Sequence, residues 1–293
     1  MQTGLEKILS SLQLEQCDST TSSATLSNFI GYGSDDSGER IYGGQVMAQA
    51  MSAAQQTVAP AFKLHAMHSS FLRQGALDKA VRYEVDAVRD GRSFITRNIV
   101  AFQAGNNGNE RPIFSATLSF HKQENGPTHS ATMPDVPPAE SLTSEKQRIS
   151  ELFKSLGRDS NYEWPIDVRY VNPVDLANPT PAPPRALVWL KTAHALPDNE
   201  ATHRQMFVYA SDNPILMPAF YPHGINPFTP GVMAATLSHS IWIHQAPRID
   251  DWLLFEIDSD FTGRGRGMGR AKVFNRNGVL VASAVQEGLI RQR

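Results

Sequence analysis

Few residues in this sequence are placed where acid–base chemistry is plausible. Two stretches set a histidine before a serine on an expected strand, "HAMHSSFLRQ" around His68 and "ATLSHSIWIHQ" around His239. Histidine exchanges a proton near neutral pH, so either residue could serve as a general base. Because the pattern occurs twice, we interpret both histidines as structural groups that hold backbone or side-chain partners.

Several familiar catalytic arrangements are missing from the sequence. There is no Gly-x-Ser-x-Gly nucleophile motif, and no His-x-x-x-His or Cys-x-x-Cys pair that would suggest a metal site. The single cysteine, Cys17, lies in a polar stretch without a basic neighbour that would activate its thiol. We therefore expect chemistry that needs no metal, no redox cofactor and no cysteine nucleophile.

Composition narrows the class of protein. The 293 residues are 41% hydrophobic and 19% charged, as in globular proteins, and the net charge of -2 gives no reason to expect nucleic acid as a partner. One cysteine cannot form an internal disulfide and fits a reducing compartment. No apolar run is long enough to span a membrane, and Glu6 and Lys7 interrupt the N-terminal one. We predict a cytoplasmic protein without membrane insertion.

The elements that must position the chemistry follow a helix-then-strands order. Apolar and small residues on more than one face of Tyr42–Val58 predict a buried helix. Antiparallel strands should follow it, with a hairpin at Asp90-Gly91. A second buried helix is predicted in "YASDNPILMPAFYPHG" (Tyr209–Gly224), started by its proline and followed again by strands. Between them, 123–164 is rich in proline and polar residues, with a charged helix expected over Ala139–Leu156.

The two halves align with each other. Glu84 pairs with Glu256, and Phe102 pairs with Phe274 at the same offset. A constant offset across several strands favours internal duplication over chance. The same comparison pairs His68 with His239, the region of His65 with Thr236, and Ser119 with Gln286. We predict domains at 1–122 and 165–293 joined by a linker at 123–164.

The order and spacing of six motifs resemble the bacterial acyl-CoA thioesterase II family. The motifs are "YGGQVMAQA", "HSSFLRQG", "VRDGRSF", "MPAFYPHG", "ATLSHSIWIH" and "VASAVQEG". The resemblance implies an α+β double hotdog fold, in which two tandem domains each wrap an antiparallel sheet around a buried helix. It also implies hydrolysis of fatty acyl-CoA in lipid metabolism without a cofactor, and a homo-oligomer, either a dimer or a tetramer.

The resemblance carries the family's catalytic roles onto Asp212, Thr236 and Gln286. A thioester needs a water held against its carbonyl, a carboxylate to take the proton and donors for the developing oxyanion. Each residue also has a structural interpretation. Asp212 resembles a helix N-cap, Thr236 a common strand residue, and Gln286 a polar group emerging at a strand edge. All three lie in the second half, so the first half would keep the fold and lack the site.

One departure from the family, three arginines of open role and two alternative functions accompany this interpretation. Ser238 stands where the family often has aspartate. Arg264, Arg266 and Arg270 in "GRGRGMGR" could meet coenzyme A phosphates or could form a solvated strand face. A hotdog enoyl-CoA hydratase is disfavoured, because its catalytic aspartate and histidine would fall on Ser211 and Leu216. A non-catalytic acyl-CoA-binding protein of the same fold stays open to experiment.

Overall fold

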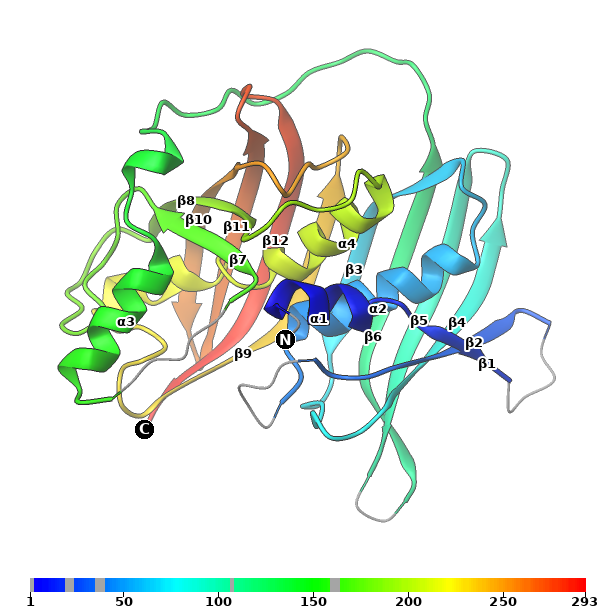
Figure 1. The fold of residues 1–293 in the computed structure, drawn as a ribbon, viewed down its shortest axis with the longest axis horizontal. Helices are drawn as coiled ribbons and strands as arrows, with labels where there is room; N and C mark the ends of the chain where they lie inside the picture. The colour runs from blue at the N-terminus through cyan, green and yellow to red at the C-terminus, as the bar shows by residue number, and fades with distance from the viewer. Residues whose placement is uncertain (1–2, 19–23, 35–39, 106–107, 159–163) are drawn as a thin grey trace. The chain divides into compact units, whose positions relative to one another are not determined.

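The computed structural model describes residues 3–18, 24–34, 40–105, 108–158 and 164–293. These residues form two compact units, Met1–His129 with Ser238–Ile243, and Ser130–Leu237 with His244–Arg293. Each unit packs helices against an antiparallel sheet, so the predicted α+β class is confirmed (Figure 1). None of the helices among the described residues is long and apolar enough to cross a membrane.

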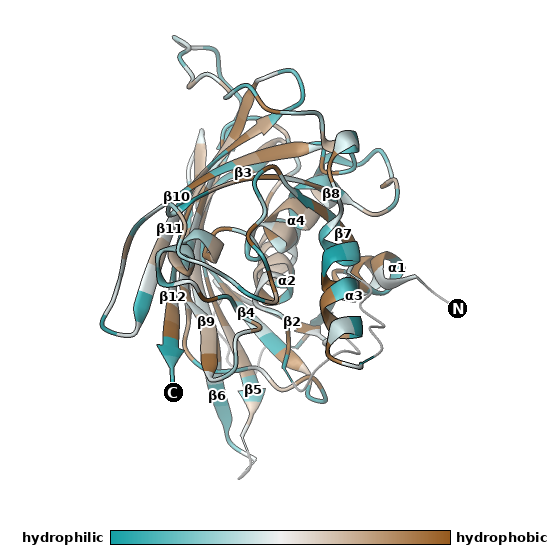
Figure 2. Ribbon diagram, turned by 90° about the vertical axis from the view of Figure 1, so that its left-hand side faces the viewer, coloured by the Kyte–Doolittle hydropathy of each residue, from teal (hydrophilic) through white to brown (hydrophobic). Residues whose placement is uncertain are grey.

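The first unit is built around one almost completely buried helix. The antiparallel strand order is β1, β2, β4, β5, β6, β3 and then the end of β9. The helices are α1(Gly4–Ser11) and α2(Gly43–Gln56), and the strands are β1(Glu15–Cys17), β2(Leu26–Gly31), β3(Phe62–Phe71), β4(Val81–Asp90), β5(Phe94–Ala104) and β6(Glu110–Lys122). Helix α2 buries every residue from Gly44 to Ala54, which confirms the helix predicted there. Figure 2 shows mainly apolar colours along it.

The second unit repeats this plan with the order β12, β11, β10, β8 and β7. Its elements are η1(Ala139–Ser141), α3(Glu145–Ser155), β7(Ile166–Tyr170), β8(Arg185–Thr192), α4(Glu200–Ser211), η2(Met217–Ala219), η3(Tyr221–His223), β9(Val232–Ile243), β10(Leu253–Gly263), β11(Arg266–Asn275) and β12(Leu280–Gln292). Buried residues of this unit, including Trp189, Trp252 and Phe274, pack against apolar residues of the segment 131–142. The charged helix expected in the linker is confirmed as α3.

The predicted position of the second buried helix was wrong. The observed helix, α4, begins at Glu200, where the Asn199 side chain accepts hydrogen bonds from the backbone N–H groups of Ala201 and Thr202, and it ends at Ser211. Proline disfavours helical conformation in the residue before it, so Pro214 marks the end of this helix rather than the start of another. Two short 3-10 turns, η2 and η3, follow in place of the predicted continuation.

Internal duplication is visible in the strand registers. The pairing of β4 with β5 is irregular between Asp86 and Arg89, and that of β10 with β11 between Asp258 and Phe261. These positions differ by the same 172 residues that separate Phe102 from Phe274. Because bulges re-aim a strand and are seldom placed alike by chance, the matching irregularities support a true repeat.

Candidate functional site

Asp212 lies at the end of a helix, where sequence analysis expected a beginning. It is the C-cap residue of α4, with helical backbone angles, and only 8% of its surface is exposed. The N-cap interpretation of this residue is therefore wrong. The C-terminal end of a helix carries partial negative charge, so α4 does not stabilise an ionised carboxylate at this position. Its stabilisation has to come from side chains on the neighbouring strands.

Thr236 and Gln286 supply those side chains. Thr236 lies half-buried on β9, and Gln286 lies on β12 with 1% of its surface exposed. The hydroxyl of Thr236 donates to Asp212 Oδ1 at 2.9 Å. Gln286 Nε2 lies 2.8 Å from Asp212 Oδ1, 3.1 Å from the Asp212 carbonyl oxygen and 2.8 Å from Thr236 Oγ1. The structure thus brings the three predicted site residues into one hydrogen-bonded cluster.

The chemistry of the donors fixes the orientation of the Gln286 amide. Its nitrogen must face Asp212, because an amide oxygen there would oppose a carboxylate oxygen. Among the residues that the structure describes, Gln286 Oε1 then has no hydrogen-bond partner, although it is buried. A buried acceptor without a donor is costly, so this oxygen is suited to receive a hydrogen bond from a molecule that enters the site.

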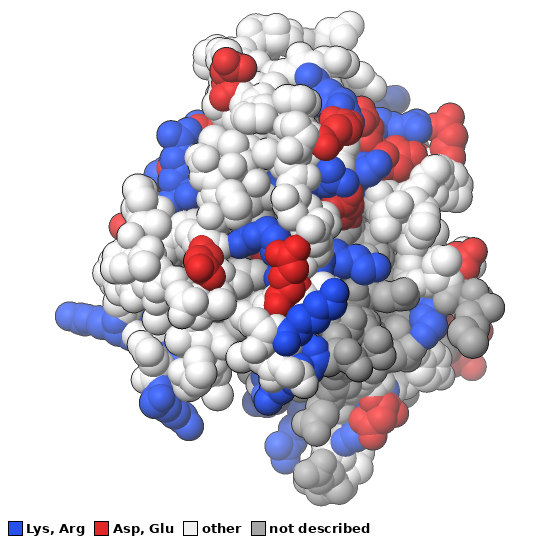
Figure 3. Space-filling view, turned by 60° about the vertical axis from the view of Figure 1, so that its left-hand side comes forward, with Lys and Arg blue, Asp and Glu red and all other residues white. Residues whose placement is uncertain are grey.

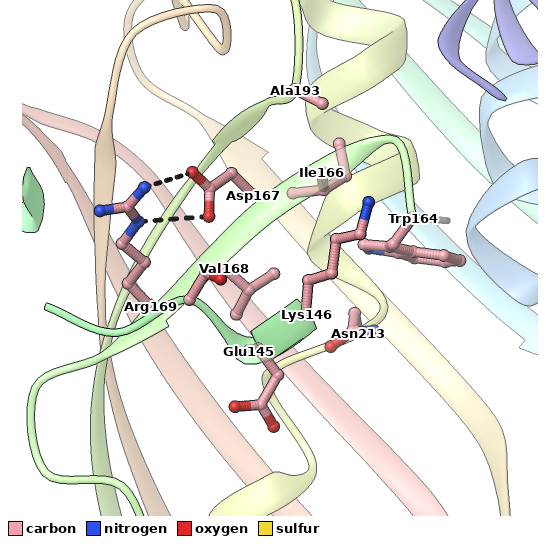
Figure 4. A pocket seen from close by; sticks show the side chains of 10 residues that line it. Glu145, Lys146, Trp164, Ile166, Asp167, Val168, Arg169, Ala193 and Asn213 are labelled. Atoms are coloured by element: carbon pink, nitrogen blue, oxygen red, sulfur yellow. Dashed lines mark hydrogen bonds and ion pairs between the residues drawn. The ribbon is translucent and has the colours of Figure 1, made fainter. Parts of the chain in front are cut away.

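A pocket of about 240 Å³ lies beside Asn213, the residue after Asp212. Trp164, Ile166 and Val168 form much of its apolar wall, and the Lys146 side chain extends toward Trp164 (Figure 4). The sequence did not indicate this pocket, because its residues come from α3 and β7 and from the segments beside them and after β8 and α4.

The two histidines are not equivalent, contrary to the sequence alignment. The backbone N–H groups of Leu72 and Arg73 both bond to the Ile113 carbonyl, and those of His244 and Gln245 both bond to the Val281 carbonyl. Leu72 therefore corresponds to His244 at an offset of 172, which pairs His239 with Met67. His68 is exposed and bonds to Ser240 Oγ at 3.1 Å, whereas His239 is fully buried. Burial lowers the pKa of His239 to about 3, so its ring is neutral. Adjacent strand positions face opposite sides, so a shift of one residue exchanged the faces.

The same register corrects the counterpart of Gln286. In the first unit Arg97 pairs with Leu118, and in the second unit Gly269 pairs with Gln286. Since Arg97 and Gly269 differ by 172 residues, the counterpart of Gln286 is Leu118 and not Ser119. Leu118 is fully buried and apolar, so the first unit has no amide at this place.

Other candidate groups have ordinary surface roles. Arg266 pairs with Glu287 at 3.0 Å and Arg270 with Asp260 at 2.6 Å, which supports the solvated-face interpretation of these arginines. Arg264 has a left-handed backbone (φ 52°) in the turn between β10 and β11. Within the described part of the chain, no group of three or more His, Cys, Asp or Glu could hold a metal ion. On the face in Figure 3, charged residues of both signs lie interspersed.

Comparisons with known proteins show the family. The family described as Acyl-CoA thioesterase matches residues 160–289, and the Acyl-CoA thioesterase N-terminal domain matches residues 33–121. Acyl-CoA thioesterase 2 of Haemophilus influenzae is 32% identical, covering 98% of each chain. Acyl-coenzyme A thioesterase 8 of Mus musculus is 32% identical over 86% of this chain and 81% of that protein.

Solved structures extend the comparison to the fold. The acyl-CoA thioesterase II TesB2 of Mycobacterium marinum superposes with a TM-score of 0.75 at 31% identity, over 99% of this chain and 98% of that one. A hotdog-fold protein of unknown function from Alicyclobacillus acidocaldarius gives 0.73 at 14% identity over the whole of both chains, a likeness of fold alone. The predicted hotdog fold is confirmed, and the chain belongs to the acyl-CoA thioesterase family.

Proposed function

We propose that this acyl-CoA thioesterase hydrolyses its substrate by direct attack of a water molecule bound at Asp212, Thr236 and Gln286. The observation that carries this proposal is the convergence of the Thr236 hydroxyl and the Gln286 amide on one oxygen of a nearly buried carboxylate. Two neutral donors at that oxygen favour the ionised form, which a base requires.

The step is a simple acyl transfer to water. The water oxygen bonds to the thioester carbonyl carbon while Asp212 takes one of its protons. The carbon–sulfur bond then breaks, the thiolate of coenzyme A takes up a proton, and a fatty acid is released. Because thiolate is a good leaving group, no covalent acyl-enzyme is needed. Detection of an acyl adduct on the protein would contradict this mechanism.

Gln286 has a second task in this proposal. Its unpartnered Oε1 accepts a hydrogen bond from the attacking water, and this holds the water close to the Asp212 carboxylate. Thr236 keeps the carboxylate in place through its hydroxyl, which donates to Asp212 and accepts from Gln286. All the polar groups near the water are then fixed before the substrate arrives, which is the basis of electrostatic preorganisation.

The pocket beside Asn213 suits an acyl chain. Trp164, Ile166 and Val168 give it one apolar wall beside the turn that carries Asp212, while charged residues line the rest, namely Glu145, Lys146, Asp167 and Arg169. We propose that the part of the chain next to the thioester enters it. Trp164→Ala should shift the preferred acyl length upward in a chain-length series, and an unchanged profile would place the chain elsewhere.

We further propose the substrate, the cellular compartment and the assembly of this protein. The substrate is fatty acyl-CoA and the protein acts in the cytoplasm, in lipid metabolism, as a homo-oligomer. Domains at 1–122 and 165–293, joined by 123–164, also remain a prediction. The single cysteine supports a reducing compartment. Light scattering on the purified protein would separate dimer from tetramer, and a monomer would contradict the assembly.

The decisive experiment is a thiol-release assay over an acyl-CoA chain-length series. Wild type should turn over, and Asp212→Ala should lose about a hundredfold or more in kcat, as expected for a general base. Asp260→Ala is the matched control, since that carboxylate is exposed and forms only a surface ion pair with Arg270. A wild type that binds acyl-CoA but is inert at every chain length would indicate a binding protein.

A further inference from the structure

Three glycines of the second unit lie in the same patch of sheet as Gln286. On β11 and β12, Gly267 pairs with Gly288, and Gly269 pairs with Gln286. Alternate residues of a strand point to one face, so the four positions share a face, and all four are buried. We call Gly267, Gly269 and Gly288 the glycine floor.

The connection that follows Asp212 lies directly on the glycine floor. A Cβ at Gly269 would meet the carbonyl oxygen and carbon of Ile215, and a Cβ at Gly288 would meet the Leu216 side chain. At Gly267 it would meet Ile290 Cδ1 of β12 at 2.6 Å and Ala219 Cβ at 2.8 Å. Contacts this short essentially do not occur for real Cβ atoms, so a side chain at Gly269 has to displace the Ile215 backbone, whereas one at Gly288 has to displace the flexible Leu216 side chain.

The first unit fills the same four positions with large side chains. By strand register, Gly267 and Gly288 correspond to Ile95 and Phe120, a pair on β5 and β6. In the same way, Gly269 and Gln286 correspond to Arg97 and Leu118. All four first-unit side chains are at least 94% buried. The two repeats therefore differ at the place where the site lies.

Arg97 shows what occupies this place when no site is present. Its guanidinium donates to the carbonyl oxygen of Thr57 at 3.0 Å and pairs with Asp90 at 2.7 Å. Thr57 is the C-cap of α2, as Asp212 is the C-cap of α4. In the first unit an arginine fixes the end of the helix, and the chain enters β3 at Phe62, five residues later.

In the second unit the sheet holds the longer connection by other means. Thr262, which replaces Asp90 at the offset of 172, donates its hydroxyl to the Ala219 carbonyl at 2.7 Å. Pro214, between Asp212 and Ile215, has a fixed φ angle and stiffens the segment. A displacement of the Ile215 carbonyl therefore also displaces Asp212.

We infer that the glycine floor positions the catalytic carboxylate, with Gly269 as its principal residue. The absent side chain at Gly269 lets the 212–216 turn settle onto β11, so that Asp212 reaches the Gln286 amide on β12. Gly269 is a positioning residue that acts through Asp212 and touches no reacting atom. The inference rests on the role proposed for Asp212.

The test is a double-mutant cycle on the full chain with acyl-CoA thiol release as the readout. Gly269→Ala should lower kcat by about a hundredfold, because roughly 1 Å of misplacement has this effect in other sites, and should leave KM within about threefold. Added to Asp212→Ala, it should cause no further loss, because residues that act as one unit are not additive. An equal further loss in that background would overturn the inference.

Two further variants keep the result interpretable if Gly269→Ala folds poorly. Gly288→Ala should also lower kcat, and Leu216→Ala should restore it to within about threefold of Leu216→Ala alone, since the expected clash is with that flexible side chain. Failure of this rescue would also contradict the inference. Val188→Ala, a buried change on β8, controls for lost stability and should keep its kcat. An active Asp212→Ala would instead refute the proposed function.

Discussion

Replacing Gln286 by leucine tests whether this residue serves catalysis rather than the stability of the fold. The first unit already carries leucine at this place, Leu118, so the shape suits a hotdog core. Loss of the hydrogen bonds to Asp212 should cost about 1.5–3 kcal/mol, as for charged partners. Removal of the buried, unpartnered Oε1 should return about 1–3 kcal/mol. The free energy of unfolding should therefore change by no more than about 2 kcal/mol.

Catalysis should respond very differently to the same change. Gln286→Leu removes one donor to the carboxylate and the acceptor proposed for the water. Loss of one oxyanion-hole donor lowers kcat by about 10²–10³ in other enzymes, and we expect a similar loss here, because both contacts of the amide are removed at once. Thiol release gives the rate, and urea unfolding at pH 7 gives the stability of the same preparation.

Gln49→Leu is the matched control for this substitution. Gln49 is a buried glutamine of α2 whose amide is fully used, donating to the Ser11 and Tyr32 carbonyls and accepting from Tyr83. Its replacement removes these hydrogen bonds, each worth about 1 kcal/mol, and should lower the free energy of unfolding by their sum. The kcat of the folded protein should stay unchanged. If Gln286→Leu instead destabilised the protein and kept its kcat, our assignment of Gln286 would be refuted.

Other variants address the remaining groups. Thr236→Val should lower kcat at least about tenfold, while Thr236→Ser, which keeps the hydroxyl bonded to Asp212, should retain most activity in the same assay. The pKa of His239 lies near 3 when folded and near 6.5 when free, so the unfolded chain binds more protons between these values. Stability should then fall below pH 6.5, by up to about 1.4 kcal/mol per pH unit from this residue. His239→Met should reduce that loss in urea unfolding at pH 7 and pH 5, and an unchanged loss would contradict it. Arg97→Ala should lower the free energy of unfolding by about 2 kcal/mol or more, because its hydrogen bonds to the end of α2 are charged. If urea unfolding showed no change, the contact with Thr57 would be unimportant.

Much of the fold followed from local patterns. The buried helix α2 has small and apolar residues around its circumference, and α3 has a capped, amphipathic pattern, so both were predicted near their observed positions. The helix α4 was misplaced because its sequence, "EATHRQMFVYAS", is polar in its first half although much of it is buried. Its His203 and Arg204 are buried through tertiary packing, which overrides local hydrophobicity.

Only part of the candidate site could be predicted from the sequence. Asp212, Thr236 and Gln286 could be named from motifs, and the structure brings them together. Their geometry could not be predicted, because it depends on where α4 ends and on strand registers. One residue of misalignment joined His68 to His239 and Ser119 to Gln286, and each pair faces opposite sides of its sheet. The glycines of "GRGRGMGR" were noticed for their arginines, whereas the comparison between repeats reveals their use.

The replacement of Ile95, Arg97, Leu118 and Phe120 by three glycines and a glutamine has an evolutionary consequence. A single-copy ancestor would have needed one set of positions to serve both folding and turnover. Duplication separates these demands, so one copy can accumulate large core side chains while the other keeps the small residues on which its catalytic turn rests. A deep mutational scan should then produce two different maps. Substitutions at the four first-unit positions should reduce cellular abundance, whereas substitutions at the glycine floor should reduce specific activity at nearly normal abundance.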